Sequence, residues 1–471
     1  MKKINPRIFN LAKVGSGYLI GEIFLRGMVF LTLPIFTRLM STDSFGKYSV
    51  YMSYENIIML VILLGVSGSI RRAKIDFGSD KLNSYISSMV SIAIISFAGM
   101  LLIYTLVYLF GIDIFGFGFI FGSLLLMHSL MSGIVKIYFI KFSIMYAYKK
   151  YLLISFIISF SNLVISFFLI KFLFNEATFK GRIIGTALPV VLAGGLMLVI
   201  IYRNGKVFYD NFYWRYALAI SLPLMIHSLS LLVLSQFDRI MISKIVGDSE
   251  AGIYSLMYSF GMLLGLVWGA LDNVWTQWVF DSLNNNNQIS IRKIAEKYIT
   301  IILTLVICAT LVLPEIIKIM VDEKFYKGIE LVVPISAAAY LGFLYTFFVQ
   351  IENFYKKTIF VAIGTSLAGI LNIILNLIFI PKFGYVAAAF TTLISYFSLL
   401  VYHSLITTFV LKIVVYRLWY ILTHGLVVII YSFSMIPFKI SLVTRFSMAA
   451  CILISIAFYL YRIIQPKKKL Y

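Results

Sequence analysis

The chain has 471 residues, of which 61% are hydrophobic and only 13% are charged, and its mean hydropathy is +0.97. A water-soluble domain of this size cannot bury so much apolar surface, so the composition excludes a soluble protein and predicts an integral membrane protein. The formal net charge of +21 would also suit a nucleic-acid-binding protein, and its distribution along the chain decides between the two.

Apolar runs recur along the whole chain and predict about fourteen transmembrane helices. Crossing roughly 30 Å of hydrocarbon takes about 20 apolar residues as helix, because every backbone N–H and C=O must find a partner within the segment. The runs lie near residues 11–36, 44–68, 84–110, 114–140, 151–172, 183–202, 214–243, 251–280, 298–321, 331–351, 358–380, 384–411, 418–437 and 442–462. Pro34, Pro189, Pro223 and Pro314 are among the prolines within or near the ends of these spans, where neighbouring helices absorb a kink. The predicted fold class is all-α integral membrane.

The basic residues are distributed unevenly between the two sides of the membrane. With the N-terminus inside, the cytoplasmic segments collect about 25 lysines and arginines and the opposite segments about 10. This asymmetry predicts that both termini lie in the cytoplasm, and it argues against a nucleic-acid partner. Binding to DNA or anionic lipid stays open for the tail containing Lys467, Lys468 and Lys469, although orientation explains these lysines more simply.

Neither a soluble catalytic domain nor a cleaved leader is expected. The first apolar run contains Glu22 and Arg26 and has no small-residue cleavage site. The longest connection is expected around residues 284–287, at about 15 to 20 residues, which is too short for a domain. No P-loop, HExxH or GxSxG motif occurs. Cys308 and Cys451 fall within predicted spans, so they indicate neither a disulfide framework nor a metal cluster.

One motif occurs twice. RLMSTDSFGKYSVYMSY begins at Arg38 and KIVGDSEAGIYSLMYSF begins at Lys244, 206 positions later, which aligns Gly46 with Gly252. Two more matches follow in the same order: GRIIGTALPVVLAG with GYVAAAFTTLISYF at an offset of 203, and SNLVISFFLI with LNIILNLIFI at an offset of 210. Chance similarity among apolar helices explains any one match, whereas three in order favour a duplication. Six spans separate the copies, so both face the same way, as in parallel repeats about an axis along the membrane normal.

The repeat predicts the domain organisation. Residues 1–208 and 209–412 form two six-helix pseudo-repeat lobes, and residues 413–471 add two further transmembrane helices and a basic cytoplasmic tail. The role of these last two helices is open: they suit covering the bundle, binding a lipid tail or contacting a polymerase.

Three segments resemble a known family. They are PIFTRLMSTDSFGKYSVY from Pro34, QFDRIMISKIVGDSEAGIYS from Gln236, and the stretch from Asn353 that contains PKFGYVAAA. These segments resemble the polysaccharide repeat-unit flippases of the O-antigen and capsule type, in the polysaccharide transport branch of the multidrug, oligosaccharidyl-lipid and polysaccharide exporter superfamily. The resemblance covers most of the chain to about residue 411. The chain departs from many relatives by having AAA at residues 387–389 where they have GAA, which bears on packing.

The resemblance implies a transporter of undecaprenyl-pyrophosphate-linked oligosaccharide, from the inner to the outer leaflet of a bacterial cytoplasmic membrane, by alternating access. It implies no enzyme activity and no cofactor, and it leaves protons and sodium open as coupling ions. The partners that it implies are the lipid-linked oligosaccharide, membrane lipids, and a polysaccharide polymerase with its chain-length regulator. The sugar and the type of polysaccharide stay open.

Ionisable residues inside predicted spans are the candidate cavity residues. Burial against lipid is costly for such groups, so they are expected to face a cavity or one another. They are Glu22, Arg26, Glu55, His128 and His227. Glu22 and Arg26 lie four residues apart on one helix face, which fits a self-neutralising pair as well as a headgroup site. Glu55 suits ion coupling, or a pair with Arg26.

Two further groups are gate or ion-pair candidates. Asp238 and Arg239 match the recurrent acidic-basic pair of the family, as an outer gate contact or, more simply, a structural ion pair. Asp272 lies among tryptophans that suit an interfacial belt better than sugar stacking. All four histidines fall in predicted spans, where a hydrogen bond between helices is the usual role. No metal site is predicted.

Two other functions stay open on the sequence alone. A multidrug or other small-molecule exporter of the same superfamily would share the fold. A membrane polysaccharide polymerase or ligase would be expected to carry a large outer loop with catalytic residues, and the predicted outer loops are short.

Overall fold

The computed structural model describes residues 30–435 and 441–464, which are almost entirely helical. The first helix seen is Phe30–Leu39. It is followed by α2 (Thr42–Ile62), η1 (Val66–Ser69), α3 (Ile70–Leu109), α4 (Gly118–Ile144), α5 (Tyr148–Phe168), η2 (Leu169–Leu173), α6 (Thr178–Gly205), α7 (Asn211–Ile245), α8 (Asp248–Gly261), α9 (Leu263–Asn284), α10 (Gln288–Met320), η3 (Glu323–Leu331), α11 (Val332–Phe354), α12 (Thr358–Phe383), α13 (Tyr385–Leu405), η4 (Ile406–Val410), α14 (Leu418–Met435) and α15 (Leu442–Ile464). Among the described residues, ten helices are long and apolar enough to cross a membrane. The chain is therefore an all-α, multi-pass membrane protein.

Local signals in the sequence set the helix ends. The Ser41 side chain accepts a hydrogen bond from the backbone N–H of Ser44 at the start of α2, and the Asp210 carboxylate does the same for Tyr213 at the start of α7. Such caps satisfy backbone donors that have no partner within the helix. Gly384 separates α12 from α13 with a φ of 67°, a conformation that glycine adopts at no steric cost.

Two connections are shorter than the apolar pattern predicts. The loop expected around residues 284–287 is only a three-residue turn, because α9 ends at Asn284 and α10 begins at Gln288. The segment expected to join the second and third spans is helical instead, since α3 begins at Ile70 and bends at Gly78. An ion pair between Arg72 and Asp76 (2.9 Å), one helical turn apart, supports this polar part of α3.

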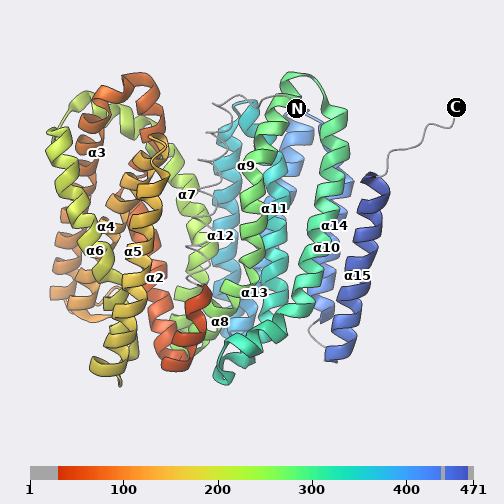
Figure 1. Ribbon diagram of the computed structural model, residues 1–471, viewed down its shortest axis with the longest axis horizontal. Coiled ribbons are helices and arrows are strands. Elements are labelled where there is room, and N and C mark those ends of the chain that lie inside the picture. Colours follow the sequence, from red (N-terminus) through yellow and green to blue (C-terminus); the bar gives the residue numbers. More distant parts are fainter. Residues whose placement is uncertain (1–29, 436–440, 465–471) are drawn as a thin grey trace. The chain divides into compact units, whose positions relative to one another are not determined.

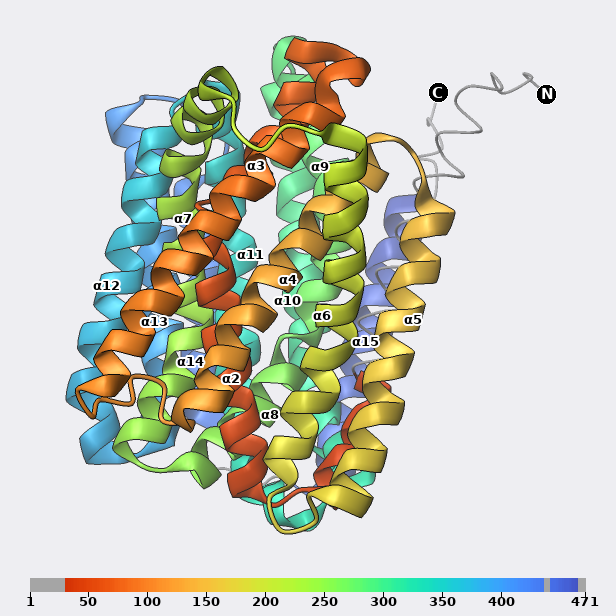
Figure 2. The ribbon, with the colours of Figure 1, turned by 90° about the vertical axis from the view of Figure 1, so that its left-hand side faces the viewer.

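The chain divides into two compact units, Met1–Gly252 and Ile253–Tyr471, which we describe separately. In the first unit, α2, α3, α4 and α6 pack together, α5 packs on α6, and α7 packs on α2 and α3 (Figure 2). Its core contains large buried side chains such as Tyr51, Tyr85 and Met89. The α5 helix buries little of its surface and exposes Leu153, Phe156 and Phe160, as expected for a lipid-facing helix.

In the second unit, α11 is the central helix. It packs against α9, α10, α12, α13 and α14, and α15 packs on α10 (Figure 1). Aromatic side chains dominate this core, among them Tyr340, Phe347 and Phe348. Because α11 is surrounded by other helices, its polar residues must find partners within the unit.

Candidate functional site

Glu55 lies on α2 in the first unit and is only 4% exposed. Its charged and polar neighbours are Ser132 and Lys136 on α4, and the Ser129 hydroxyl donates to the Glu55 backbone carbonyl (3.4 Å). Lys136 is exposed on the surface of the chain although α4 is a candidate membrane span. The sequence analysis did not single out Lys136. Its position two helical turns after His128 in the same apolar span was the available signal.

His128 lies on α4, next to Ser129, whose hydroxyl bonds the backbone of Glu55 on α2. Its Nδ1 atom is 3.4 Å from the Tyr51 hydroxyl, and the two rings stack with centroids 5.9 Å apart. Both side chains are buried. The pair joins α2 to α4, so His128 makes the bond between helices that is usual for a histidine in a span.

Arg182 on α6 is a buried cation that the sequence analysis did not identify. Its guanidinium donates to Asn162 Oδ1 (2.6 Å) and Ser166 Oγ (2.8 Å) on α5. It also lies over the ring of Phe36, with its central carbon 3.7 Å from the ring centroid, and near Tyr48 (4.8 Å). No carboxylate among the described residues forms an ion pair with it. The positive charge is therefore held by aromatic faces and neutral oxygens.

The two copies of the repeated motif touch each other. A Cβ atom built on Gly46 would lie 1.7 Å from the carbonyl oxygen of Asp248, and one built on Gly252 would lie 2.2 Å from that of Thr42. Thr42 and Asp248 are themselves aligned by the 206-residue offset. Each motif thus presents the same glycine to the same carbonyl of the other, which is the contact that a local two-fold axis produces. Close approach of the two backbones requires glycine at both positions.

The other candidates on α7 are spread along the helix. His227 is half-buried, whereas Asp238 is fully buried. The Arg239 guanidinium donates to the side-chain oxygen of Gln236 and to the backbone of Ser235. Gln236 Oε1 also accepts from Ser53 on α2 (3.4 Å), so this end of α7 is tied to α2 by polar contacts. Glu55 and His128 lie on α2 and α4.

Asp272 lies on α9 in the second unit. Its carboxylate accepts a hydrogen bond from Gln350 Nε2 on α11 (2.9 Å). The nearby rings of Trp275 and Tyr298 pack at 5.3 Å between centroids. Asp272 is therefore a half-buried residue that bonds to α11, and Trp275 near it packs in the aromatic core.

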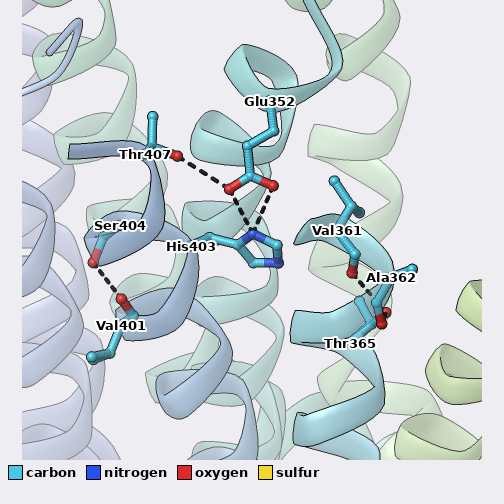
Figure 3. Close-up of polar contacts among 8 residues, drawn as sticks. All are labelled: Glu352, Val361, Ala362, Thr365, Val401, His403, Ser404 and Thr407. Atoms are coloured by element: carbon cyan, nitrogen blue, oxygen red, sulfur yellow. Dashed lines mark hydrogen bonds and ion pairs between the residues drawn. The ribbon is translucent and has the colours of Figure 1, made fainter. Parts of the chain in front are cut away.

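A buried acid-histidine pair lies elsewhere in the second unit (Figure 3). Nδ1 of His403 on α13 is 2.9 and 3.0 Å from the two carboxylate oxygens of Glu352 on α11. Thr407, on η4, donates its hydroxyl to the same carboxylate (3.1 Å). Both ionisable side chains are 0% exposed. The sequence analysis placed His403 in a span but missed Glu352, because it ended that span at residue 351.

A second polar cluster joins α12 to α13. The Asn372 amide donates to Thr392 (3.2 Å), the Asn376 amide donates to Asn372 Oδ1 (3.2 Å), and Thr391 donates to Asn376 Oδ1. All four side chains are buried. The cluster is neutral. It holds together α12 and α13, the two helices that meet within the PKFGYVAAA segment.

Glu22 and Arg26 lie outside the described residues. Within the described part of the chain, no three His, Cys, Asp or Glu side chains come together in a way that would hold a metal ion. What the described side chains offer is a set of buried proton-titrating, cationic and amide groups inside apolar helix bundles. Such groups are rare in membrane spans and usually mark ion or substrate pathways.

The sequence and the fold were compared with known proteins. Residues 11–271 match the model of the polysaccharide biosynthesis protein family. Two proteins of Haemophilus influenzae are each 22% identical to the chain: an uncharacterized membrane protein, over 74% of this chain and 85% of its own length, and Lsg locus putative protein 1, over 56% and 65%.

Among solved structures, an inward-facing multidrug resistance MATE family transporter of the MOP superfamily has a TM-score of 0.62 at 12% identity, covering 88% of this chain and 96% of that one. The lipid II flippase MurJ, in an inward closed conformation, has a TM-score of 0.59 at 14% identity, covering 94% and 98%. The family match spans more than half of the chain. The chain therefore belongs to the polysaccharide biosynthesis protein family and has the fold of the MATE and MurJ transporters.

Proposed function

We propose that this protein flips undecaprenyl-pyrophosphate-linked oligosaccharide repeat units from the inner to the outer leaflet of a bacterial cytoplasmic membrane, by alternating access, for the synthesis of a surface polysaccharide. Membership of the polysaccharide biosynthesis family carries this proposal. The fold likeness to a protein described as a lipid II flippase supports it. The protein moves its substrate and does not synthesise it.

The physical problem explains why such a fold is needed. A pyrophosphate and several sugars cannot cross hydrocarbon unaided, since each unpaired polar group costs several kcal/mol and each charge costs more. The described helices carry cations suited to an anionic headgroup: Arg182 is buried and pairs with no carboxylate among the described residues, and Lys136 is exposed on a candidate span. A prenyl tail is apolar, so it needs no polar partners in the protein and can stay in the lipid.

The proposal includes a finer architecture. About fourteen transmembrane helices form two six-helix lobes, residues 1–208 and 209–412, followed by two additional helices in residues 413–471, with both termini in the cytoplasm. A polymerase and its chain-length regulator are the proposed protein partners. Arg26 is the proposed contact for the pyrophosphate, with Glu22 as its neighbour on the helix. Glu55, His128 and His227 are proposed to line the substrate path.

A deletion strain tests the function directly. Complete lipid-linked units are expected to accumulate on the inner leaflet, where an impermeant glycan-labelling reagent added outside does not reach them. Reintroducing the gene should restore external labelling. Complete units labelled from outside in the deletion strain would contradict the proposal and point to a polymerase or ligase.

A drug or small-molecule exporter is the second candidate, because a MATE transporter has the fold likeness given above. An exporter of this kind predicts that the deletion raises sensitivity to cationic drugs and leaves surface polysaccharide unchanged. The flippase proposal predicts the opposite pattern. Measuring both in one strain separates the two functions.

A further inference from the structure

One end of α6 carries a cavity that the proposed function does not use. The cavity has a volume of about 620 Å³. It lies at the last turns of α6, a candidate membrane span that ends at Gly205. Volumes of about 300 to 1,000 Å³ are typical of pockets that hold small molecules. The cavity is lined by two apolar side chains, a phenol and two cations: Leu198, Val199, Tyr202, Arg203 and Lys206.

One face of α6 changes from apolar to cationic at this end. Leu192, Leu196 and Val199 are exposed and follow one another at spacings of four and three residues, which places them on one side of the helix. Arg203 and Lys206 are also exposed and continue the same spacing, with Lys206 directly after the last helical residue. A phospholipid has the same order of groups, because its apolar chains lie in the hydrocarbon and its anionic phosphate lies at the boundary with water.

Aromatic side chains mark this end of α6 as a membrane boundary. The ring of Phe208 stacks on Tyr202 with centroids 6.1 Å apart, and Tyr209 packs edge-on against Trp214 at 5.0 Å. The indole N–H of Trp214 donates to the backbone carbonyl of Ser88 on α3 (3.1 Å). Tyrosine and tryptophan are enriched at the interface between lipid and water, where one part of the ring is apolar and the other is wet. The two cations therefore lie at the depth of lipid headgroups.

Neither cation is neutralised by a carboxylate that the structure describes. Arg203 and Lys206 form no ion pair with another described residue. The nearest acid along the chain, Asp210, accepts a hydrogen bond from the backbone N–H of Tyr213 (3.0 Å) and caps α7. Basic side chains at the end of a span also act as simple interface anchors. An anchor needs no cavity beside it, whereas a bound ligand does.

Two serines of α3, one helical turn apart, fix the wall of the cavity. The Tyr202 hydroxyl is 2.6 Å from Ser91 Oγ, which holds the phenol in place. Ser87 Oγ accepts from the backbone N–H of Val207 (3.3 Å), in the connection from α6 to α7. A Cβ atom built on Gly205 would lie 2.2 Å from Ser87 Oγ, so glycine is needed for this close packing. The connection crosses α3 at the top of Figure 2. The cavity is therefore preformed.

We propose that this cavity is a binding site for one anionic phospholipid of the surrounding membrane. The phosphate lies between Arg203 and Lys206, so it bridges the end of α6 and the connection to α7, and an acyl chain lies along Leu198 and Val199. The site faces the leaflet on the side of that connection, which is the cytoplasmic and anionic leaflet in the proposed topology. The inference rests on the position of α6 as a candidate span and does not depend on the transported substrate.

Lipid preference is measured on the purified full-length protein in a non-ionic detergent, with fluorescent phosphatidylglycerol and phosphatidylcholine of the same chains as probes. The wild type should bind phosphatidylglycerol saturably and about tenfold more tightly than phosphatidylcholine, because only the former has a net negative charge. Equal affinity for the two lipids would overturn the proposal. Inorganic phosphate that competes as well as unlabelled phosphatidylglycerol would assign the site to a soluble anion and overturn it too.

A pair of double variants tests the two cations. Arg203→Gln with Lys206→Gln should weaken phosphatidylglycerol binding about thirtyfold, because each basic side chain near an anionic lipid contributes about fivefold. The matched control, Lys149→Gln with Lys150→Gln, removes two exposed cations at the start of α5 and should keep the wild-type affinity. Equal weakening in both double variants would mean general attraction to a basic protein, which contradicts a defined site.

The shape and place of the site are tested separately. Val199→Trp keeps both cations but fills the cavity, so it should abolish saturable binding; wild-type affinity in this variant would exclude the cavity as the site. A photoactivatable phosphatidylglycerol, crosslinked to the wild type and mapped by mass spectrometry, should label residues 198–206. Labelling confined to other helices would overturn the proposal, and this result needs no variant to fold.

Discussion

In both units, polar side chains join two consecutive helices, α5 and α6 in the first unit and α12 and α13 in the second. The first of these clusters contains a cation, whereas the second is neutral. In the first unit, Asn162 and Ser166 on α5 receive the guanidinium of Arg182. In the second unit, the residues aligned with Asn162 and Ser166 by the 210-residue offset are Asn372 and Asn376, which bond threonines of α13 instead.

The difference separates two roles of polar groups in a membrane protein. Neutral amide and hydroxyl bonds hold helices together in both units, because an unsatisfied polar group in an apolar bundle is costly. Charge is added differently in each: a cation among aromatic rings in the first unit, and an acid-histidine pair in the second. The two units therefore share neutral bonds between helices and differ in the ionisable groups that they bury.

The largest effect is expected where the two repeats are most alike. Gly46→Val and Gly252→Val should each prevent stable folding, since the new side chain overlaps a backbone carbonyl of the other motif and overpacking costs about 3 kcal/mol or more. The measurement is thermal unfolding of the purified protein in detergent. Gly99→Val on α3 is the control, because a Cβ there meets nothing within 4 Å. Normal stability of either variant would contradict the mutual contact of the repeats.

A smaller effect should distinguish the charged cluster from the neutral one. Arg182→Met removes the guanidinium that donates to Asn162 and Ser166 and that lies over the ring of Phe36, so we expect a loss of about 3 kcal/mol. Asn376→Leu in the second unit should lose only about 1 to 2 kcal/mol, because it removes neutral hydrogen bonds. Unfolding of both variants under one condition gives the comparison.

The same pair of variants also tests the assigned roles. If Arg182→Met is as stable as wild type but fails to move substrate, the cation serves the ligand and not the fold. Equal loss of stability in both variants would remove the contrast between the units. Arg182→Lys should be intermediate, because lysine keeps the charge but not the planar group that fits two oxygens and an aromatic face.

The smallest effect is expected at His424. Its Nδ1 atom bonds the Tyr420 carbonyl one turn earlier on the same helix, 2.7 Å away, so this bond stays within α14. His424→Gln should change the unfolding free energy by no more than about 0.5 kcal/mol. Tyr51→Phe, which removes the partner of the interhelical His128, should cost about 1 kcal/mol in the same measurement. A larger loss for His424→Gln than for Tyr51→Phe would break this ranking.

Much of the fold could be predicted, because the position and length of each apolar run along the chain indicate where a membrane-crossing helix lies. The predicted span near residues 358–380 corresponds to α12, Thr358–Phe383, and the span near residues 214–243 corresponds to α7, Asn211–Ile245. The connections were less predictable. Polar residues in the first turns of α3 and α10 read as loop in the sequence, whereas the helices simply continue beyond the apolar run.

The sequence by itself determined the all-α membrane character, the repeated motif and the placement of Glu55 and His128 on apolar helices, because apolar composition and spacing act within a single helix. Only the tertiary structure decided which polar groups meet: Glu352 and His403 are 51 residues apart, and Arg182 and Asn162 are 20 apart. In an apolar bundle each polar side chain must bond to whatever a neighbouring helix presents at its depth, and helix packing sets that choice.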